Sequence, residues 1–127
     1  MRTLISLFPL AFVLLSAGCD AIQSGNCTAE AEPAIEVEVI DAATGEPAAE
    51  GATGVVTEGA YSDSLIVIGI NADNQEFLLG GAYERTGTYD VRVEKEGYQT
   101  WTREGVRVRG DDCGPRTVRL TAQLEQD

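Results

Sequence analysis

The side chains that most often carry catalysis are scarce in this sequence. It contains no histidine, three cysteines and 21 aspartate and glutamate residues. Without histidine, the usual Ser-His and Cys-His nucleophile systems cannot form, and a zinc site loses its main nitrogen ligand. Pairs of carboxylates act as acid and base in glycosidases, but so many acidic residues produce such pairs by chance. We therefore expect no enzymatic activity and no cofactor.

Two clusters of oxygen-bearing side chains are candidates for Ca²⁺, which takes roughly six to eight oxygen ligands. They are Asn71, Asp73, Asn74 and Glu76 in one segment, and Asp111 and Asp112 in another. Neither cluster fits the pattern of the EF-hand calcium loop. Asn and Asp also favour turns, because their side chains bond to their own backbone. Turn formation accounts for both clusters, so we expect no metal site.

The first residues of the chain, 1–18, have the organisation of a cleavable export signal. A basic start at Arg2 precedes the mainly apolar stretch Leu4–Leu15, and the small residues Ser16–Gly18 follow it. This order of basic, apolar and small residues is typical of signal peptides. A membrane-spanning helix needs about 20 apolar residues, so the stretch is too short to span a membrane. We expect residues 1–18 to be removed on export.

The sequence Leu15-Ser16-Ala17-Gly18-Cys19 resembles the lipobox of bacterial lipoproteins. That family usually has Leu three positions before the cysteine, where this sequence has Ser16. The resemblance implies lipidation of the Cys19 sulfur and attachment to a membrane through that lipid. The protein would then belong to the bacterial cell envelope and face the periplasm or the exterior. An ordinary signal peptide that is cut after Ala17 or Gly18 is the alternative.

The charge of the chain excludes one class of partner. The formal net charge is −12, and nucleic-acid binding requires a basic face to meet the phosphate backbone. We therefore expect no nucleic-acid partner. The polar stretch from Cys19 to Pro33 shows no hydrophobic period and is expected to be a tether, residues 19–33. Residues 34–125 are enough for one domain with a modest core.

Alternating apolar and polar residues predict short strands along this domain. Ile35–Val39 alternates strictly, with carboxylates on the polar side, which is the period of a half-buried strand. The same reasoning predicts strands at 53–57, 61–70, 77–79, 88–95, 101–109 and 117–124. About seven short strands without a helical period indicate an all-β fold. We expect an antiparallel or mixed, Ig-like sandwich of two sheets.

Several local details follow from these patterns. The run Leu65–Ile68 suits burial on both faces of a sheet. Gly80–Gly81 is expected to end one strand, and Gly110–Pro115 is expected to form a turn. In the strand at 101–109, Arg107 and Arg109 are expected to point outward, because they alternate with apolar residues that point inward.

Two stretches resemble carboxypeptidase regulatory-like domains, which are transthyretin-like (prealbumin-like) sandwiches. The first is Asp41–Ala48 (DAATGEPA), which follows an alternating strand. The second is Gly87–Val93 (GTYDVRV), which is followed by Gly97 and Tyr98. The resemblance covers roughly residues 35–124. It implies a transthyretin-like fold and an accessory role, because in that family the peptidase chemistry belongs to a different domain.

Cys27 and Cys113 remain once Cys19 is assigned to the lipid, and an exported protein enters an oxidising compartment. In transthyretin-like sandwiches the first and last strands run parallel and side by side. Cys27 precedes the first predicted strand, and Cys113 precedes the last. The resemblance therefore implies that both cysteines lie at one end of the same sheet and form a disulfide. Two free thiols, or a bridge between two molecules, are the alternatives.

Tyr61, Tyr98 and Trp101 are the candidate ligand contacts. If they were exposed together, they would form a glycan platform like that of carbohydrate-binding modules. Tyr89, in register with Val91, is instead expected in the core, and Trp101 is expected to be mostly buried against a turn. We therefore favour a lipid-anchored envelope module that acts through binding or structural contacts, with envelope proteins as partners. A carbohydrate-binding module is the alternative.

Overall fold

The chain forms strands and turns throughout the part that the structure describes. A computed structural model describes Cys27 and residues 30–127. No helix occurs among these residues, so none is long and apolar enough to cross a membrane. The prediction of an all-β fold is confirmed. The strands are β1 (Pro33–Asp41), β2 (Thr53–Glu58), β3 (Tyr61–Ile70), β4 (Glu76–Tyr83), β5 (Gly87–Glu94), β6 (Trp101–Val108), β7 (Gly110–Asp111), β8 (Gly114–Pro115) and β9 (Val118–Leu124).

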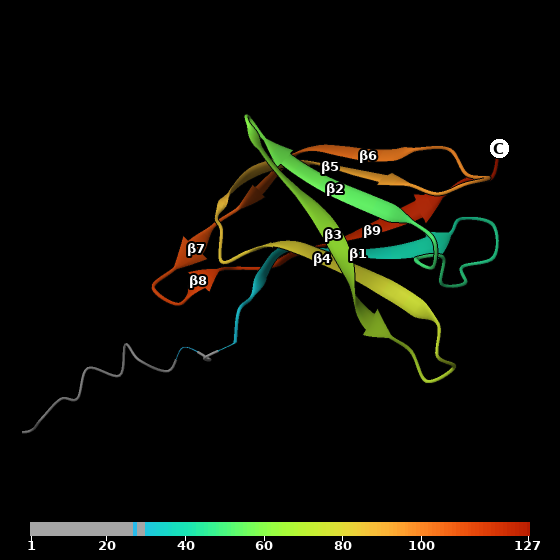
Figure 1. The fold of residues 1–127 in the computed structure, drawn as a ribbon, viewed down its shortest axis with the longest axis horizontal. Coiled ribbons are helices and arrows are strands. Elements are labelled where there is room, and N and C mark those ends of the chain that lie inside the picture. Colours follow the sequence, from blue (N-terminus) through green and yellow to red (C-terminus); the bar gives the residue numbers. More distant parts are fainter. Residues whose placement is uncertain (1–26, 28–29) are drawn as a thin grey trace, which may run out of the picture.

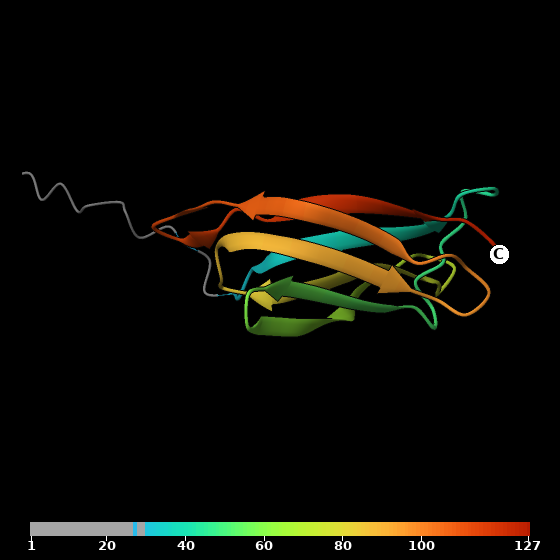
Figure 2. The ribbon, with the colours of Figure 1, turned by 90° about the horizontal axis from the view of Figure 1, so that it is seen from above.

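Seven of these strands form one mixed sheet, in the order β6-β5-β2-β3-β4-β1-β9. Strand β3 belongs to both halves of the sheet, because Tyr61–Leu65 pairs with β2 and Ile66–Ile70 pairs with β4. The sheet folds over at β3, so that β2 and β5 lie across the core from β1 and β9 (Figure 1, Figure 2). Strands β6 and β9, the two ends of the sheet, lie beside each other (Figure 2). The sheet therefore almost closes around its core.

Inward-facing residues of these strands make the core. In β1, Ile35, Val37 and Val39 are fully buried, while the glutamates between them face the other way. Tyr89 in β5 is also fully buried. Its hydroxyl donates to the carbonyl oxygen of Arg85 at 2.7 Å and accepts from the Arg85 Nη1 at 3.0 Å, which satisfies a buried polar group. The prediction that Tyr89 belongs to the core is confirmed.

Strands β1 and β9, which come first and last along the chain, are parallel neighbours in the sheet. Strand β1 pairs with β9 from Ile35 opposite Val118 to Asp41 opposite Leu124. On its other side, β1 pairs with β4 in the antiparallel sense. The parallel register means that β1 and β9 begin at the same end of the molecule and finish at the other. The expectation that these two strands run parallel is confirmed.

The expected burial of Leu65–Ile68 on both faces is wrong. Leu65 is buried, but the exposed fraction of Ile66 is 57% and that of Val67 is 39%. Strand β2 pairs with β3 only as far as Leu65. The later residues of β3 therefore have a neighbouring strand on one side only. A run of apolar residues indicates a strand, but the run itself does not show how many neighbours cover it.

Gly80 and Gly81 do not end a strand, because β4 continues through them to Tyr83. At both positions a side chain of β3 passes close to the backbone. A Cβ atom on Gly80 would lie 2.6 Å from Cδ1 of Ile68, and one on Gly81 would lie 2.7 Å from Cδ2 of Leu65. Glycine inside a strand often marks such a close approach. Here it lets β3 and β4 pack together rather than breaking the strand.

The segment Gly110–Pro115 is a small hairpin and not a simple turn. Strand β7 pairs with β8 in the antiparallel sense, with Gly110 opposite Pro115 and Asp111 opposite Gly114. Asp112 and Cys113 connect the two strands. Two residue pairs are too few to produce a visible alternation, which is why the sequence pattern indicated only a turn. The hairpin places Cys113 at its tip.

Asp41 joins three segments at the end of β1, where it is buried. Its Oδ1 accepts hydrogen bonds from the backbone N–H groups of Ala43 and Thr44, at 2.8 and 3.0 Å. Its Oδ2 accepts from the hydroxyl of Tyr98 at 2.7 Å and from Nε2 of Gln126 at 3.0 Å. These donors, Tyr98 first, hold the pKa of Asp41 well below its ordinary value. The carboxylate in turn raises the pKa of Tyr98.

Replacing the Asp41 carboxylate by an amide should destabilise the protein most at neutral pH. The folded-state pKa lies below the unfolded value of about 3.9, so the stabilising contribution is complete above that value and is lost as the pH falls toward the folded pKa. We expect Asp41→Asn to lower the unfolding midpoint by about 5 °C near pH 7, and by less near pH 3. Thermal unfolding followed by circular dichroism measures both differences. Asp73→Asn, at an exposed turn residue, is the control. A difference that is the same at both pH values would contradict the role of the charge.

Candidate functional site

The two domain cysteines are joined. A disulfide links Cys27 to Cys113, with 5.0 Å between their Cα atoms, which is inside the usual range for such bonds. The predicted pairing is confirmed. The third cysteine, Cys19, and its predicted lipid lie outside the described residues, as do the signal peptide and most of the tether.

The parallel arrangement of β1 and β9 explains this bond. Cys27 lies upstream of β1, and Cys113 lies in the hairpin that precedes β9. Because the two strands begin at the same end of the sheet, the segments before them meet there. The backbone N–H of Cys113 donates to Oδ1 of Asp111 at 2.9 Å, which holds the hairpin tip in shape. We refer to this end of the molecule, with the disulfide and the β7–β8 hairpin, as the disulfide end.

Tyr61 lies close to the disulfide end and is packed among its neighbours. The guanidinium carbon of Arg85 is 3.7 Å from the centre of the Tyr61 ring, and the rings of Tyr61 and Tyr89 are 6.2 Å apart. Burial raises the pKa of the Tyr61 hydroxyl. Arg85 itself forms an ion pair with Glu58 at 2.9 Å. These contacts give Tyr61 a structural role in holding Arg85 in place.

Tyr98 and Trp101 lie at the opposite end of β5. Trp101 faces Val93, the residue next to the end of β5, and packs against the core with more of its surface covered than exposed. The Tyr98 hydroxyl is already bound to Asp41. Tyr61 is near the start of β5 instead. The structure therefore does not bring the three predicted contact residues together, and a single glycan platform made of all three is not present.

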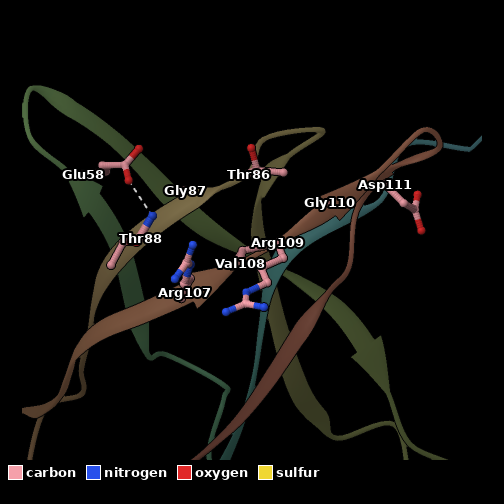
Figure 3. Close-up of a pocket in the computed structure, with 9 residues that line it drawn as sticks. All are labelled: Glu58, Thr86, Gly87, Thr88, Arg107, Val108, Arg109, Gly110 and Asp111. Carbon is pink, nitrogen blue, oxygen red and sulfur yellow. Dashed lines mark hydrogen bonds between the residues drawn. The ribbon is translucent and has the colours of Figure 1, made fainter.

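A solvent-open hollow of about 730 Å³ lies beside the β7–β8 hairpin, at the disulfide end (Figure 3). Arg107, near the end of β6, and Arg109, just after β6, line one side of it, and Glu58, at the end of β2, lies on the other (Figure 3). Thr86 and Thr88 contribute to the lining, at the start of β5. The hollow therefore combines two cationic side chains with two hydroxyl groups.

The acidic residues that line the hollow already have partners. Glu58 accepts a hydrogen bond from the backbone N–H of Thr88 and pairs with Arg85. These two contacts, Thr88 first, lower the pKa of Glu58. Asp111, also in the lining, lies 3.5 Å from Nε of Arg116. Each carboxylate thus faces a donor of its own.

Arg107 and Arg109 differ from these neighbours. Neither forms an ion pair with a carboxylate among the residues that the structure describes, and both are exposed. Guanidinium groups bind carboxylates and phosphates through paired hydrogen bonds. The two arginines can therefore receive an anionic group in the hollow. The strand pattern predicted that both would point outward. Their proximity to the hollow depends on the β7–β8 hairpin, which no pattern indicated.

The two predicted turn clusters behave as parts of turns. Oδ1 of Asn71 accepts from the backbone N–H groups of Asp73 and Gln75, at 3.0 and 2.9 Å, and Asp111 shapes the hairpin as described above. Among the described residues, no group of three or more His, Cys, Asp or Glu side chains is placed to hold a metal ion. A scan against protein-family models finds no match for this sequence, and a search of curated proteins finds none either. The geometry is therefore the basis for assigning a function.

Removing the disulfide should lower stability while leaving the fold in place. The bond closes a loop with a sequence separation of 86 residues, for which the chain-entropy model gives up to about 4.5 kcal/mol. The double variant Cys27→Ser, Cys113→Ser should unfold at a lower denaturant concentration and keep the β-type far-UV spectrum.

Mass spectrometry of an unreduced digest of the exported protein should yield a cross-linked peptide containing both cysteines. Two alkylatable thiols in the unreduced, denatured wild type would show that the bond is absent.

Proposed function

We propose that this chain is a lipid-anchored accessory module of the bacterial cell envelope, which acts through binding contacts and catalyses no reaction. The observation that carries this proposal is the disulfide between Cys27 and Cys113. It connects the segment that follows Cys19 to one end of the domain. A lipid on Cys19 would then hold not only the chain but a particular face of it toward the membrane.

The length of the segment between Cys19 and Cys27 limits how far the disulfide end can lie from the lipid. Residues 20–26 separate Cys19 from Cys27. An extended chain covers at most about 3.6 Å per residue, so the disulfide end stays within about 30 Å of the lipid. Without the bond, the same end would be held only through a longer stretch of chain before β1. The disulfide therefore serves to orient the domain as well as to stabilise it.

The topology supports an accessory role. Strands β1 and β9, which come first and last along the chain, are parallel neighbours, as in the transthyretin-like sandwiches that the sequence resembles. Strand β3 passes from one layer to the other and joins them. We propose on this basis that the domain is an Ig-like, transthyretin-like sandwich of the carboxypeptidase regulatory-like type. Such modules are accessory in their family.

The arginine-lined hollow at the disulfide end supplies a binding surface. With a net charge of −12, most of the protein repels anionic groups. Arg107 and Arg109 form an exception, since no carboxylate among the described residues neutralises them. A carboxylate or phosphate group of an envelope partner would therefore be directed to this end of the domain, which faces the membrane.

Loss of the lipidated sulfur should release the protein from membranes. We expect Cys19→Ser to move the protein from the membrane fraction to the soluble fraction of the native host, because the anchor depends on acyl chains that are attached at this residue. Fractionation and immunoblotting measure the distribution. The Cys113→Ser variant is the control, since it removes a cysteine and leaves the anchor. A Cys19→Ser protein that stays wholly in membranes would refute the lipid anchor.

The two arginines of the hollow should bind a simple anion. Titration of the soluble Cys19→Ser protein with inorganic phosphate should shift the side-chain NMR signals of Arg107 and Arg109 saturably, with a Kd of about 1 mM. The double variant Arg107→Ala, Arg109→Ala should weaken this binding at least about tenfold. Arg92→Ala is the matched control, because Arg92 is an exposed arginine that already pairs with Glu94. Equal shifts with chloride at the same ionic strength would contradict a site for oxyanions.

A further inference from the structure

One stretch of strand edge on β3 has no neighbour. On one side β3 pairs with β4, and on the other side β2 pairs with it only from Tyr61 to Leu65, which lies opposite Gly54. Along Ile66–Ile70, no strand among the described residues meets the backbone groups on that second side. Figure 1 shows β3 leaving β2 and running on beside β4. An open row of backbone groups is a template for another strand.

The side chains of the same stretch are apolar and exposed. The exposed fractions are 57% for Ile66, 39% for Val67 and 56% for Ile70. No charged residue and no proline interrupts the sequence from Leu65 to Ile70, although sheet edges are usually protected by such residues. The outer strands of the sheet, β6 and β9, lie against each other instead. The exposed backbone and the exposed apolar side chains therefore coincide on one short segment.

We propose that this edge of β3 pairs with the same edge of a second copy of the chain, in the antiparallel sense and about a two-fold axis at Ile68. The free edge has fixed limits. At one end, the pair formed by Gly54 and Leu65 occupies it. At the other end the chain turns back toward β4, where the N–H of Asn71 donates to the carbonyl oxygen of Gln75 at 2.9 Å. Only Ile66–Ile70 lies between these limits, and a second copy brings a segment of the same length.

Pairing about Ile68 matches apolar residues with one another. Ile66 lies opposite Ile70 of the second copy, and Val67 lies opposite Gly69. Cross-strand pairs of β-branched residues stabilise a sheet. Ile68 has no partner on β4, because a bulge occurs there, so the strand bends at the two-fold axis. Since each copy uses the same surface, the pair is closed and leaves this edge unavailable to a third copy.

Charge provides a signature for this contact. The paired segments are uncharged, while each whole chain carries a net charge of −12, so the two copies repel at low ionic strength. Added salt screens that repulsion and should tighten the pair. An association held by ion pairs would respond in the opposite sense. The salt dependence therefore distinguishes pairing through the β3 edge from contact through charged surfaces.

Sedimentation velocity of the Cys19→Ser protein tests the proposal without depending on the lipid anchor. We expect a reversible dimer with a Kd of about 10 µM that becomes tighter as NaCl is raised. The double variant Ile66→Lys, Ile70→Lys should weaken it at least about tenfold, and both positions are exposed enough for the monomer to keep its fold and unfolding midpoint. Tyr83→Lys is the matched control, because Tyr83 is an exposed apolar residue, at 38%, away from the free edge. A wild type that stays monomeric at about 1 mM, or equal weakening by Tyr83→Lys, would overturn the proposal.

Cross-linking of the full chain in host membranes tests the same contact in place. Ile68→Cys should give a disulfide-linked dimer on mild oxidation, because the two residues face each other across the axis. Ser62→Cys is the control, since Ser62 is an exposed residue of the same strand whose edge is covered by β2. Linkage of Ile68→Cys only to other proteins, or to nothing, would show that a second copy does not occupy the edge.

Discussion

The parallel pairing of β1 with β9 is the constraint on which the rest of the structure depends. It aligns the beginnings of the two strands, so the segments before them meet and Cys27 bonds to Cys113. It also aligns their ends, so Asp41 at the end of β1 is within reach of Gln126, which follows β9. One strand pair thus fixes a covalent bond at one end of the molecule and a carboxylate-centred hydrogen-bond network at the other. Because β1 also pairs with β4, disturbing it would disturb the sheet on both sides.

Strand β3 differs from β1, which has a paired strand on each side along most of its length, because the two halves of β3 pair with different strands. The first half pairs with β2 and helps to close the core, while the second half pairs with β4 alone. Gly80 and Gly81 permit this passage, since a Cβ atom at either position would force the side chain of Ile68 or Leu65 to shift. The same departure from β2 leaves apolar side chains in solvent. The sheet is therefore continuous at β1, which has a paired strand on each side, and open at the end of β3, which has one.

The charged side chains fall into two groups, those that are paired within the fold and those that are left without a partner. The chain is strongly acidic, yet the carboxylates that matter to the fold are used internally: Asp41 accepts four hydrogen bonds, and Glu58 accepts from Thr88 and pairs with Arg85. Donors to a carboxylate stabilise its ionised form, which is why the pKa values of both residues fall. Arg107 and Arg109 lack such partners among the described residues. Two neighbouring unpaired cations in a negative protein attract an anion to the end of the molecule where they lie.

The sequence by itself determined the all-β class, the approximate strand positions and the burial of Tyr89, because a period of two is a local property of the chain. The pairing of Cys27 with Cys113 also followed from the sequence, through the order of the strands in a resembling family. Only the tertiary structure decided which strand edges are covered and which side chains share a surface. These depend on partners far apart in the chain: β2 stops pairing at Leu65, so Ile66 is exposed although its sequence reads as buried. The β7–β8 hairpin likewise brings Asp111 to the hollow that Arg107 lines. The length of β5 keeps Tyr61, near its start, away from Trp101, near its end. Burial and proximity are set by pairing across the sheet, which alternation along one strand does not encode.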